Sequence, residues 1–183
     1  HIIFDNEKHQ SVLRYPKLAE RSFTVFSFGK TLHATGWKMG YVIAPENMMK
    51  EFRKVHQFNV FTVNTPMQFG LATYLSDASH YLNLPVFYQA KRDFFRAGLE
   101  KTAFKLLPTP GTYFQCVDYT ALAIPEAKLN EADFCKWLTT DIGVAAIPVS
   151  AFYEEPTESG VIRFCFAKQE QTLSSALDRL QKL

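Results

Sequence analysis

The chain has 183 residues, a net charge of +2, and apolar residues at 47% of its positions. This apolar content excludes a disordered chain, and the length suits one domain or two small ones. Lys and Arg are scattered without a basic run, so nucleic acid is not an expected partner. No apolar run reaches the roughly 20 residues of a membrane span, so we expect no membrane partner.

The cysteines and histidines give no metal-binding pattern. Cys116, Cys135 and Cys165 form no Cys-x-x-Cys pair, and the five histidines lie at no spacing typical of metal ligands. We therefore expect no metal site. An odd number of unpaired thiols favours buried cysteines in a reducing compartment, so the expected location is cytoplasmic.

Two apolar runs in the first part of the chain predict strands. Residues 23–28 and 41–44 are apolar on both faces, which is typical of strands buried inside a layered α/β sheet. The loop between them carries Lys30 and is expected at a sheet edge that faces a cleft. The other elements expected here are a strand end over 2–4, a polar connection over 5–21, and helices over 46–57 and 66–76.

The rest of the chain predicts a long helix followed by a small α+β domain. The helix is expected over 85–102, with an apolar stripe at spacings of three and four. Asn130 is expected to cap a second helix that ends at Gly143. Strands are expected over 113–118, 145–148 and 161–167. The apolar stripes are Phe87, Ala90, Phe94 and Ala97 in the long helix, and Leu173, Ala176, Leu177 and Leu180 in the last one.

Arg163 lies inside an expected strand. In a strand, Val161, Arg163 and Cys165 share one face, while Ile162 and Phe164 share the other. A guanidinium flanked by Val161 and Cys165 is not on an ordinary solvated face. Taken alone, this favours an ion pair within the chain. A substrate carboxylate is the alternative, since the planar fork of Arg binds carboxylates through two hydrogen bonds.

The most informative stretch runs from Ser27 to Gly40 and reads Ser-Phe-Gly-Lys-Thr-Leu-His-Ala-Thr-Gly-Trp-Lys-Met-Gly. It places Lys30 directly after a strand, with small residues and a second cation, Lys38, following. Such a lysine suits pyridoxal phosphate, because its ε-amine can form a Schiff base with the cofactor's aldehyde. Ser27 and Lys38 are then within reach of the phosphate. The plainer interpretation is a solvated loop lysine, a small buried serine and a surface cation.

This stretch resembles the lysine signature of class I pyridoxal-phosphate-dependent aminotransferases. Within that family it is most similar to the kynurenine, glutamine and methionine aminotransferases, in which Ala-Thr-Gly-Trp-Lys follows the lysine, as at 34–38 here. Lys38 stands where many members carry Arg, and His33 stands where small residues are usual. Four later segments also resemble the family in the same order, at 61–68, 110–114, 143–153 and 162–164.

The resemblance implies an α/β fold, the pyridoxal-phosphate-dependent transferase fold type I. Residues 1–90 would be the end of its large layered α/β domain, and residues 91–183 its small α+β C-terminal domain. The catalytic residue would be Lys30. The implied roles of the other residues are cofactor binding by Ser27, Lys30 and Lys38, and substrate binding by Arg163, Phe61, Thr62 and Tyr113.

The implied reaction is transamination of an L-amino acid of aromatic, kynurenine, methionine or glutamine type with a 2-oxo acid, with pyridoxal 5'-phosphate as cofactor. The implied assembly is a homodimer with active sites at the subunit interface, in which Phe61 and Thr62 complete the partner's pocket. The family's Asp-x-x-Tyr motif would lie just upstream of His1. We therefore expect this chain to be a C-terminal half that needs the N-terminal half of the same enzyme and is inactive alone.

Two alternatives remain open from the sequence. One is a C–S β-lyase or a decarboxylase that uses the same lysine, because reaction choice depends on which bond of the substrate Cα is activated. The other is an aminotransferase-like sensor module of a transcription regulator, which would carry a DNA-binding domain upstream.

Overall fold

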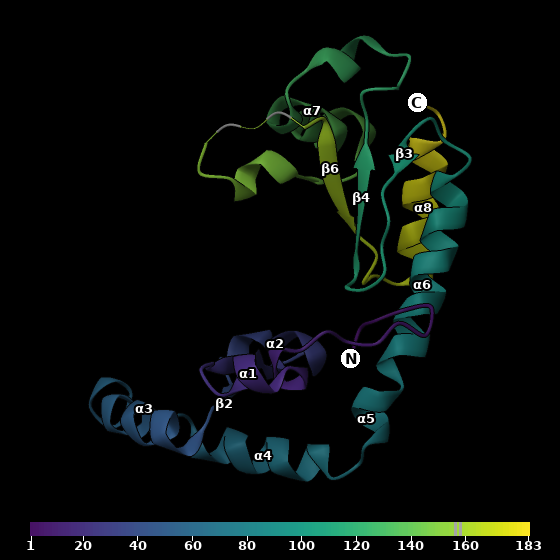
Figure 1. The fold of residues 1–183 in the computed structure, drawn as a ribbon. Helices are drawn as coiled ribbons and strands as arrows, with labels where there is room; N and C mark the ends of the chain where they lie inside the picture. The colour runs from purple at the N-terminus through teal and green to yellow at the C-terminus, as the bar shows by residue number, and fades with distance from the viewer. Residues whose placement is uncertain (156, 158) are drawn as a thin grey trace. The chain divides into compact units, whose positions relative to one another are not determined.

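The computed structural model of the chain describes residues 1–155, 157 and 159–183. They form two compact units, drawn in Figure 1. The first unit holds His1 and Glu7–Leu84, and the second holds Ile2–Asn6 and Pro85–Leu183. This division falls near the start of α6 (Leu84–Leu99), a few residues before the boundary expected at residue 90. The domain boundary of the whole protein stays a prediction.

The first unit contains a two-stranded antiparallel ribbon and helices. In the ribbon, Thr24 pairs with Ile43 and Ser27 pairs with Gly40. The two main helices begin and end within two residues of their expected positions. The elements are β1 (Thr24–Ser27), β2 (Gly40–Ile43), α1 (Pro16–Ala19), α2 (Phe28–Thr31), α3 (Glu46–Asn59), α4 (Thr65–Leu75) and α5 (Ser79–Leu82).

The prediction that β1 and β2 are buried on both faces is wrong for this chain. Val25 is 73% exposed, and Tyr41 and Ile43 are also exposed. A strand residue is buried only where another element covers its face, and in the described part of the chain these side chains keep much of their surface uncovered. The residues along β1 therefore alternate between half-buried and exposed. The apolar run correctly predicted a strand, but not its surroundings.

The second unit is built on a four-stranded antiparallel sheet in the order β3-β4-β6-β5. Cys116 of β4 and Ile147 of β5 both pair with Arg163 of β6, so Arg163 is in a central strand. Helices α6 and α8 lie side by side next to this sheet (Figure 1). The elements are β3 (Lys105–Leu106), β4 (Phe114–Asp118), β5 (Ile147–Pro148), β6 (Val161–Cys165), α7 (Glu131–Trp137) and α8 (Glu170–Leu180).

The core of the second unit lies against one face of this sheet. Ile162 and Phe164 are buried, whereas Val161, Arg163 and Cys165 are half-buried, so the predicted division of β6 into two faces is confirmed. Phe164 meets the edges of two further rings, Phe95 of α6 and Phe104. The expected stripe of α8 is also confirmed by the buried side chains of Leu173, Leu177 and Leu180.

The buried face of α6 differs from the predicted one. Phe87, Ala90, Phe94 and Ala97 are exposed, and the neighbouring stripe is buried instead. That stripe contains a charge and a glycine, so hydrophobicity alone did not reveal it. A side chain at Gly98 would come within 2.3 Å of Leu177, which explains the glycine. The buried residues are Tyr88, Arg92, Phe95, Gly98 and Leu99.

Arg92 can lie on a buried face because its charge is compensated. Its guanidinium forms a two-pronged ion pair with Asp5, donates to the carbonyl of Thr109 at 3.0 Å, and lies over the Phe4 ring. The Asp5 hydrogen bonds raise the pKa of Arg92, and those of Arg92 lower the pKa of Asp5. These contacts tie Ile2–Asn6 to the second unit.

The termini of α7 follow the predicted capping pattern. The side-chain oxygen of Asn130 accepts a hydrogen bond from the backbone N–H of Asp133 at 2.9 Å. After a π-helical turn over Leu138–Ile142, the chain leaves the helix at Gly143. Gly143 has φ of +75°, a conformation that favours glycine.

Candidate functional site

The Lys30 loop, defined here as residues 28–39, is closed at its base. Ser27 and Gly40 pair across β1 and β2, and the N–H of Phe28 donates to the carbonyl of Met39 at 3.1 Å. Lys30 lies in the single helical turn α2 that follows β1 directly. The three residues expected to bind the cofactor therefore come from the loop or its base.

Local hydrogen bonds give the Lys30 loop its shape. The side chain of Ser27 caps α2 by accepting from the N–H of Gly29 at 3.1 Å. The hydroxyl of Thr35 donates to the carbonyl of Gly29 at 3.0 Å. A Cβ at Gly40 would lie only 2.5 Å from the carbonyl oxygen of Phe26. The glycine is thus required for the close approach of the two strands at the loop base.

Lys38 has an unusual backbone conformation for a residue with a side chain. Its φ of 55° and ψ of 41° are left-handed, and it ends the 3-10 turn over Thr35–Trp37. Such conformations cost on the order of 1 kcal/mol and are concentrated at binding and catalytic sites. Lys38 is followed directly by the buried side chain of Met39, which anchors the loop at this point.

The polar groups of the loop are accessible to a ligand. Ser27, Lys30 and Lys38 are all exposed, and none of the ion pairs found among the described residues involves either lysine. The hydroxyl of Ser27 accepts one hydrogen bond and can still donate its own proton to an anion. Two cations and a hydroxyl on one closed loop suit an anionic ligand that also reacts with an amine.

Arg163 is the second candidate centre, and it belongs to the second unit. Its guanidinium carbon lies 3.9 Å from the centre of the Phe114 ring and 4.7 Å from that of Phe152. Its Nε is buried without a hydrogen-bond partner. No ion pair joins Arg163 to another described residue, so the described part of the chain offers no support for the ion-pair interpretation.

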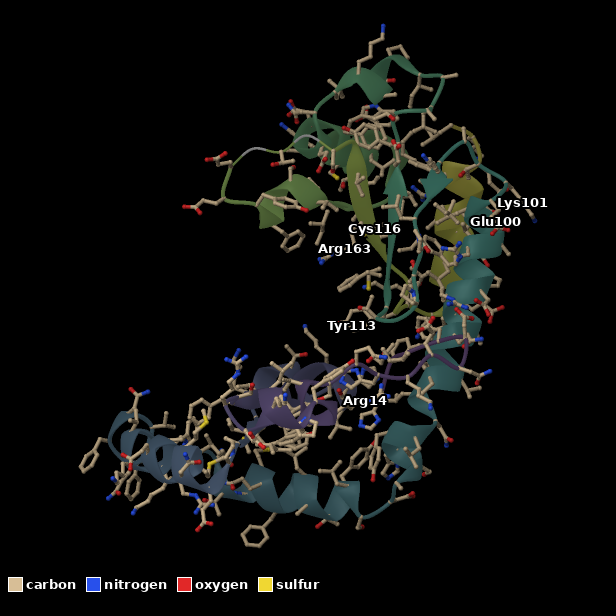
Figure 2. All side chains as sticks on the ribbon, in the orientation of Figure 1. Arg14, Glu100, Lys101, Tyr113, Cys116 and Arg163 are labelled. Carbon is tan, nitrogen blue, oxygen red and sulfur yellow. The ribbon has the colours of Figure 1, made fainter. Side chains whose placement is uncertain are left out.

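Tyr113 and Cys116 lie on the same side of the sheet as Arg163. Figure 2 shows all three side chains on the side of β4 and β6 away from α6 and α8. Burial raises the pKa of the Tyr113 hydroxyl and of the Cys116 thiol, and the charge of Arg163 opposes both shifts. Both groups therefore stay protonated at neutral pH and leave the positive charge of Arg163 uncompensated.

Phe61 and Thr62 lie between α3 and α4 in the first unit. Phe61 is exposed and has φ of 66°, and the hydroxyl of Thr62 donates to the carbonyl of Val63 at 3.1 Å. An exposed aromatic ring held by a strained backbone is suited to contact another molecule. Their role in a partner subunit's pocket stays a prediction.

Two aromatic residues that contact Arg163 were not identified individually from the sequence. Phe114 and Phe152 fall inside the segments 110–114 and 143–153 that resemble the family, but the resemblance gave no reason to pair them with Arg163. The pairing of β4 with β6 places Phe114 near Arg163, and the 3-10 turn over Val149–Phe152 does the same for Phe152.

The described residues contain neither a cluster of metal ligands nor a membrane-spanning helix. Among the residues described, no three His, Cys, Asp or Glu side chains gather closely enough to hold a metal ion. No helix in this described part is long and apolar enough to cross a membrane.

The family model for class I and II aminotransferases matches residues 1–180. The chain belongs to this family. It is 49% identical to the methionine aminotransferase of Escherichia coli (strain K12) over 184 residues, which cover 100% of this chain and 47% of that protein. It is 33% identical to kynurenine--oxoglutarate transaminase 1 of Rattus norvegicus over 199 residues, which cover 99% of this chain and 47% of the relative.

Solved structures of family members have the same fold. A crystal structure of an Escherichia coli protein with methionine aminotransferase function matches with a TM-score of 0.92 at 49% identity, covering 100% of this chain and 47% of that one. The N-succinyldiaminopimelate aminotransferase of Mycobacterium tuberculosis matches with a TM-score of 0.85 at 32% identity. This match covers 99% of this chain and 47% of that one. The predicted fold class is thereby confirmed. The chain spans about half the length of the curated aminotransferases it matches.

Proposed function

We propose that the full-length protein is a pyridoxal-phosphate-dependent aminotransferase, which transfers the amino group of an L-amino acid to a 2-oxo acid. The observation that carries the proposal is the position of Lys30. Its amine is exposed on a loop closed by Ser27 and Gly40, with a second cation, Lys38, on the same loop. Membership of the aminotransferase family supports the same function.

Pyridoxal 5'-phosphate, when bound, supplies an aldehyde that condenses with amines and a ring that withdraws electrons from the substrate Cα. Lys30 is the residue that would hold the aldehyde through its Nζ. When the substrate amine takes the place of Lys30, the freed Nζ would accept the proton from the substrate Cα. Lys30 would thus both hold the cofactor and act as the catalytic base.

Ser27 and Lys38 would hold the phosphate group of the cofactor. The hydroxyl of Ser27 can donate a hydrogen bond, and Lys38 supplies a positive charge that does not depend on a precise direction of approach. Gly40 supports this role by letting the loop close at its base, because a Cβ at that position would not fit against the carbonyl oxygen of Phe26. A loop that anchors the phosphate fixes the position of the ring relative to Lys30.

Arg163 would bind the α-carboxylate of the substrate, and Tyr113 would border the substrate. A guanidinium over two aromatic rings, with a buried and unpartnered Nε, keeps donors available for an incoming carboxylate. Holding the carboxylate fixes the direction of the Cα–H bond and so decides which bond is broken.

We propose methionine as the first amino donor to test, followed by kynurenine and glutamine. The 49% identity with a methionine aminotransferase supports this order. The proposed assembly is a homodimer in which Phe61 and Thr62 contribute to the partner's active site, and in which an N-terminal half of the enzyme completes the cofactor site. The proposed location is the cytoplasm.

The test is an amino-transfer assay on the full-length protein saturated with pyridoxal phosphate. Methionine and a 2-oxo acid should give 4-methylsulfanyl-2-oxobutanoate and a new amino acid. Release of a thiol from a cysteine conjugate without amino transfer would instead indicate the β-lyase. Binding of amino acids without turnover would indicate a sensor, and either result would contradict the proposal.

A further inference from the structure

Glu131 is a carboxylate buried in the second unit that no step of the proposed reaction uses. It is the first residue of α7 and its exposed fraction is 0%. Among the described residues, three backbone N–H groups and one hydroxyl donate hydrogen bonds to its two oxygens. These donors are the N–H of Ser150 at 2.7 Å, the N–H and the hydroxyl of Ser159 at 2.8 Å each, and the N–H of Val161 at 3.2 Å.

The donors belong to two segments that both lead to Arg163. Ser150 lies in the 3-10 turn over Val149–Phe152, whose last residue places its ring against the guanidinium. Val161 begins β6, two residues before Arg163, and so shares its face of the sheet. One carboxylate therefore holds both the strand that carries the arginine and the turn that carries one of its two aromatic contacts.

The two aromatic contacts of Arg163 are supported in different ways. Phe114 is part of β4, where it pairs with Cys165 in the sheet ladder. Phe152 is exposed and lies in a short turn, so it has no ladder to hold it. The hydrogen bond from Ser150 to Glu131 ties that turn to α7. Loss of the Glu131 carboxylate should therefore shift the position of the Phe152 ring more than that of the Phe114 ring.

The charge state of Glu131 is suited to this role. Burial alone would raise the pKa of Glu131, but the hydrogen bonds from Ser150, Ser159 and Val161 outweigh it and lower the pKa to about 2. The group is therefore ionised at neutral pH, the state in which both of its oxygens accept hydrogen bonds. A neutral amide of the same shape would turn an NH₂ group toward at least one of these donors and so lose that hydrogen bond.

We propose that Glu131 is a positioning residue for the substrate-carboxylate site, acting through the Val149–Phe152 turn and the start of β6 to set the orientation of Arg163. The inference rests on the proposed function of Arg163. It predicts that loss of Glu131 specifically weakens binding of the substrate carboxylate and leaves binding of the substrate amine at Lys30 unchanged.

The experiment compares two analogues of methionine on the full-length protein loaded with pyridoxal phosphate. One, 4-(methylsulfanyl)butanoate, keeps the carboxylate and lacks the amine. The other, 3-(methylsulfanyl)propan-1-amine, keeps the amine and lacks the carboxylate. In Glu131→Gln, binding of the acid should weaken about tenfold or more, and the KM for methionine should rise by a similar factor. The affinity for the amine, measured through the change in the cofactor's absorbance, should change less than twofold.

The matched control is Asp133→Asn. Asp133 is an exposed carboxylate in the same first turn of α7, and its side chain accepts from Asn130 rather than from the segments near Arg163. Both substitutions remove one negative charge from the start of the same helix. Asp133→Asn should leave the binding of both analogues within twofold of the wild type.

Phe152→Leu keeps the test decisive if Glu131→Gln does not fold. Phe152 is exposed, so its replacement leaves the core intact, and it should weaken the acid analogue selectively, by about threefold to tenfold. A folded Glu131→Gln with unchanged or equally reduced binding of both analogues would overturn the inference. If Glu131→Gln is unfolded, unchanged acid binding in Phe152→Leu would overturn it.

Failure of the proposed function would give a different result. If wild-type protein does not transfer the amino group of any donor, the proposed function fails before any variant is compared. If wild-type protein is active and Arg163→Ala weakens the acid analogue while Glu131→Gln does not, only the role of Glu131 is wrong.

Discussion

The two units differ in how completely this chain surrounds its candidate site residues. In the second unit, Phe4, Phe134, Ile162 and Phe166 are fully buried, and a guanidinium, an amide and a carboxylate are buried with hydrogen-bond partners. In the first unit, large apolar side chains such as Val25, Phe58, Phe61 and Phe69 are mostly exposed. The second unit has its own core, whereas the first unit buries little apolar surface.

The two candidate centres are therefore completed in different ways. The aromatic contacts of Arg163 and the hydrogen bonds that orient them come from this chain alone. The Lys30 loop supplies its own shape, but its functional groups lie exposed. We therefore expect the Lys30 site to need further protein around it, from an N-terminal half or a second subunit, and the Arg163 site to be formed already.

Lys30→Ala should abolish amino transfer by the full-length protein, with a loss of at least about 10³-fold, because both the cofactor attachment and the catalytic base are removed. It should leave thermal unfolding of the chain unchanged, since Lys30 is exposed. The control is Lys50→Ala, which removes an exposed lysine from α3 of the same unit. Retention of more than a tenth of the wild-type rate in Lys30→Ala would exclude this role.

In the isolated chain, truncating a large apolar side chain should lower the free energy of unfolding much more in the second unit than in the first. Phe134→Ala should reduce the free energy of unfolding by about 3–5 kcal/mol, because Phe134 is fully buried and stacks on Tyr119. Phe58→Ala should change it by less than about 0.5 kcal/mol, because Phe58 is 87% exposed. Urea titration monitored by circular dichroism measures both. Equal losses would contradict the contrast between the units.

Arg163→Ala should weaken transition-state binding of every amino-acid donor by roughly 2–5 kcal/mol, the cost of removing one partner of a buried charge pair. Cofactor absorbance should be retained, because Arg163 and Lys30 belong to different units. The measurement is kcat/KM for several donors, with Arg53→Ala as a control, because Arg53 is exposed on α3. Release of the cofactor with turnover preserved would show that the assigned role is wrong.

The stability of the second unit should fall in acid through Glu131. Because hydrogen bonds lower the pKa of Glu131 to about 2 in the folded state, against an ordinary value of 4.5, its contribution is fully present above pH 4.5. That contribution is lost as the pH falls from about 4.5 to about 2. Unfolding free energies of wild type and Glu131→Gln should therefore converge over this interval. Parallel curves would contradict the assignment.

Local sequence patterns predicted the elements whose structure is decided locally. Asn130 and Gly143 bound a helix in the predicted way, and the alternating faces of β6 followed from the period of a strand. The family resemblance of the Lys30 run predicted a fold class that the comparisons confirm. In each case the signal lies in a short stretch of residues.

Features that depend on distant segments were not predictable in the same way. The buried face of α6 is set by Asp5, which pairs with Arg92, and by Leu177, which packs on Gly98. The sequence does not distinguish Glu131 from any other acidic residue at a helix start, because its described donors lie 19 to 30 positions further along the chain. The exposure of Val25 depends on what packs against that face of β1, and no local pattern encodes that.

Lys30 is the residue that we propose binds pyridoxal phosphate. Borohydride reduction of the cofactor-loaded, full-length protein, followed by proteolysis and mass spectrometry, tests it most directly. We expect a pyridoxyl adduct on the peptide that contains Lys30, and its loss in Lys30→Ala but not in Lys50→Ala. An adduct on another lysine, or none in cofactor-saturated wild-type protein, would contradict the claim.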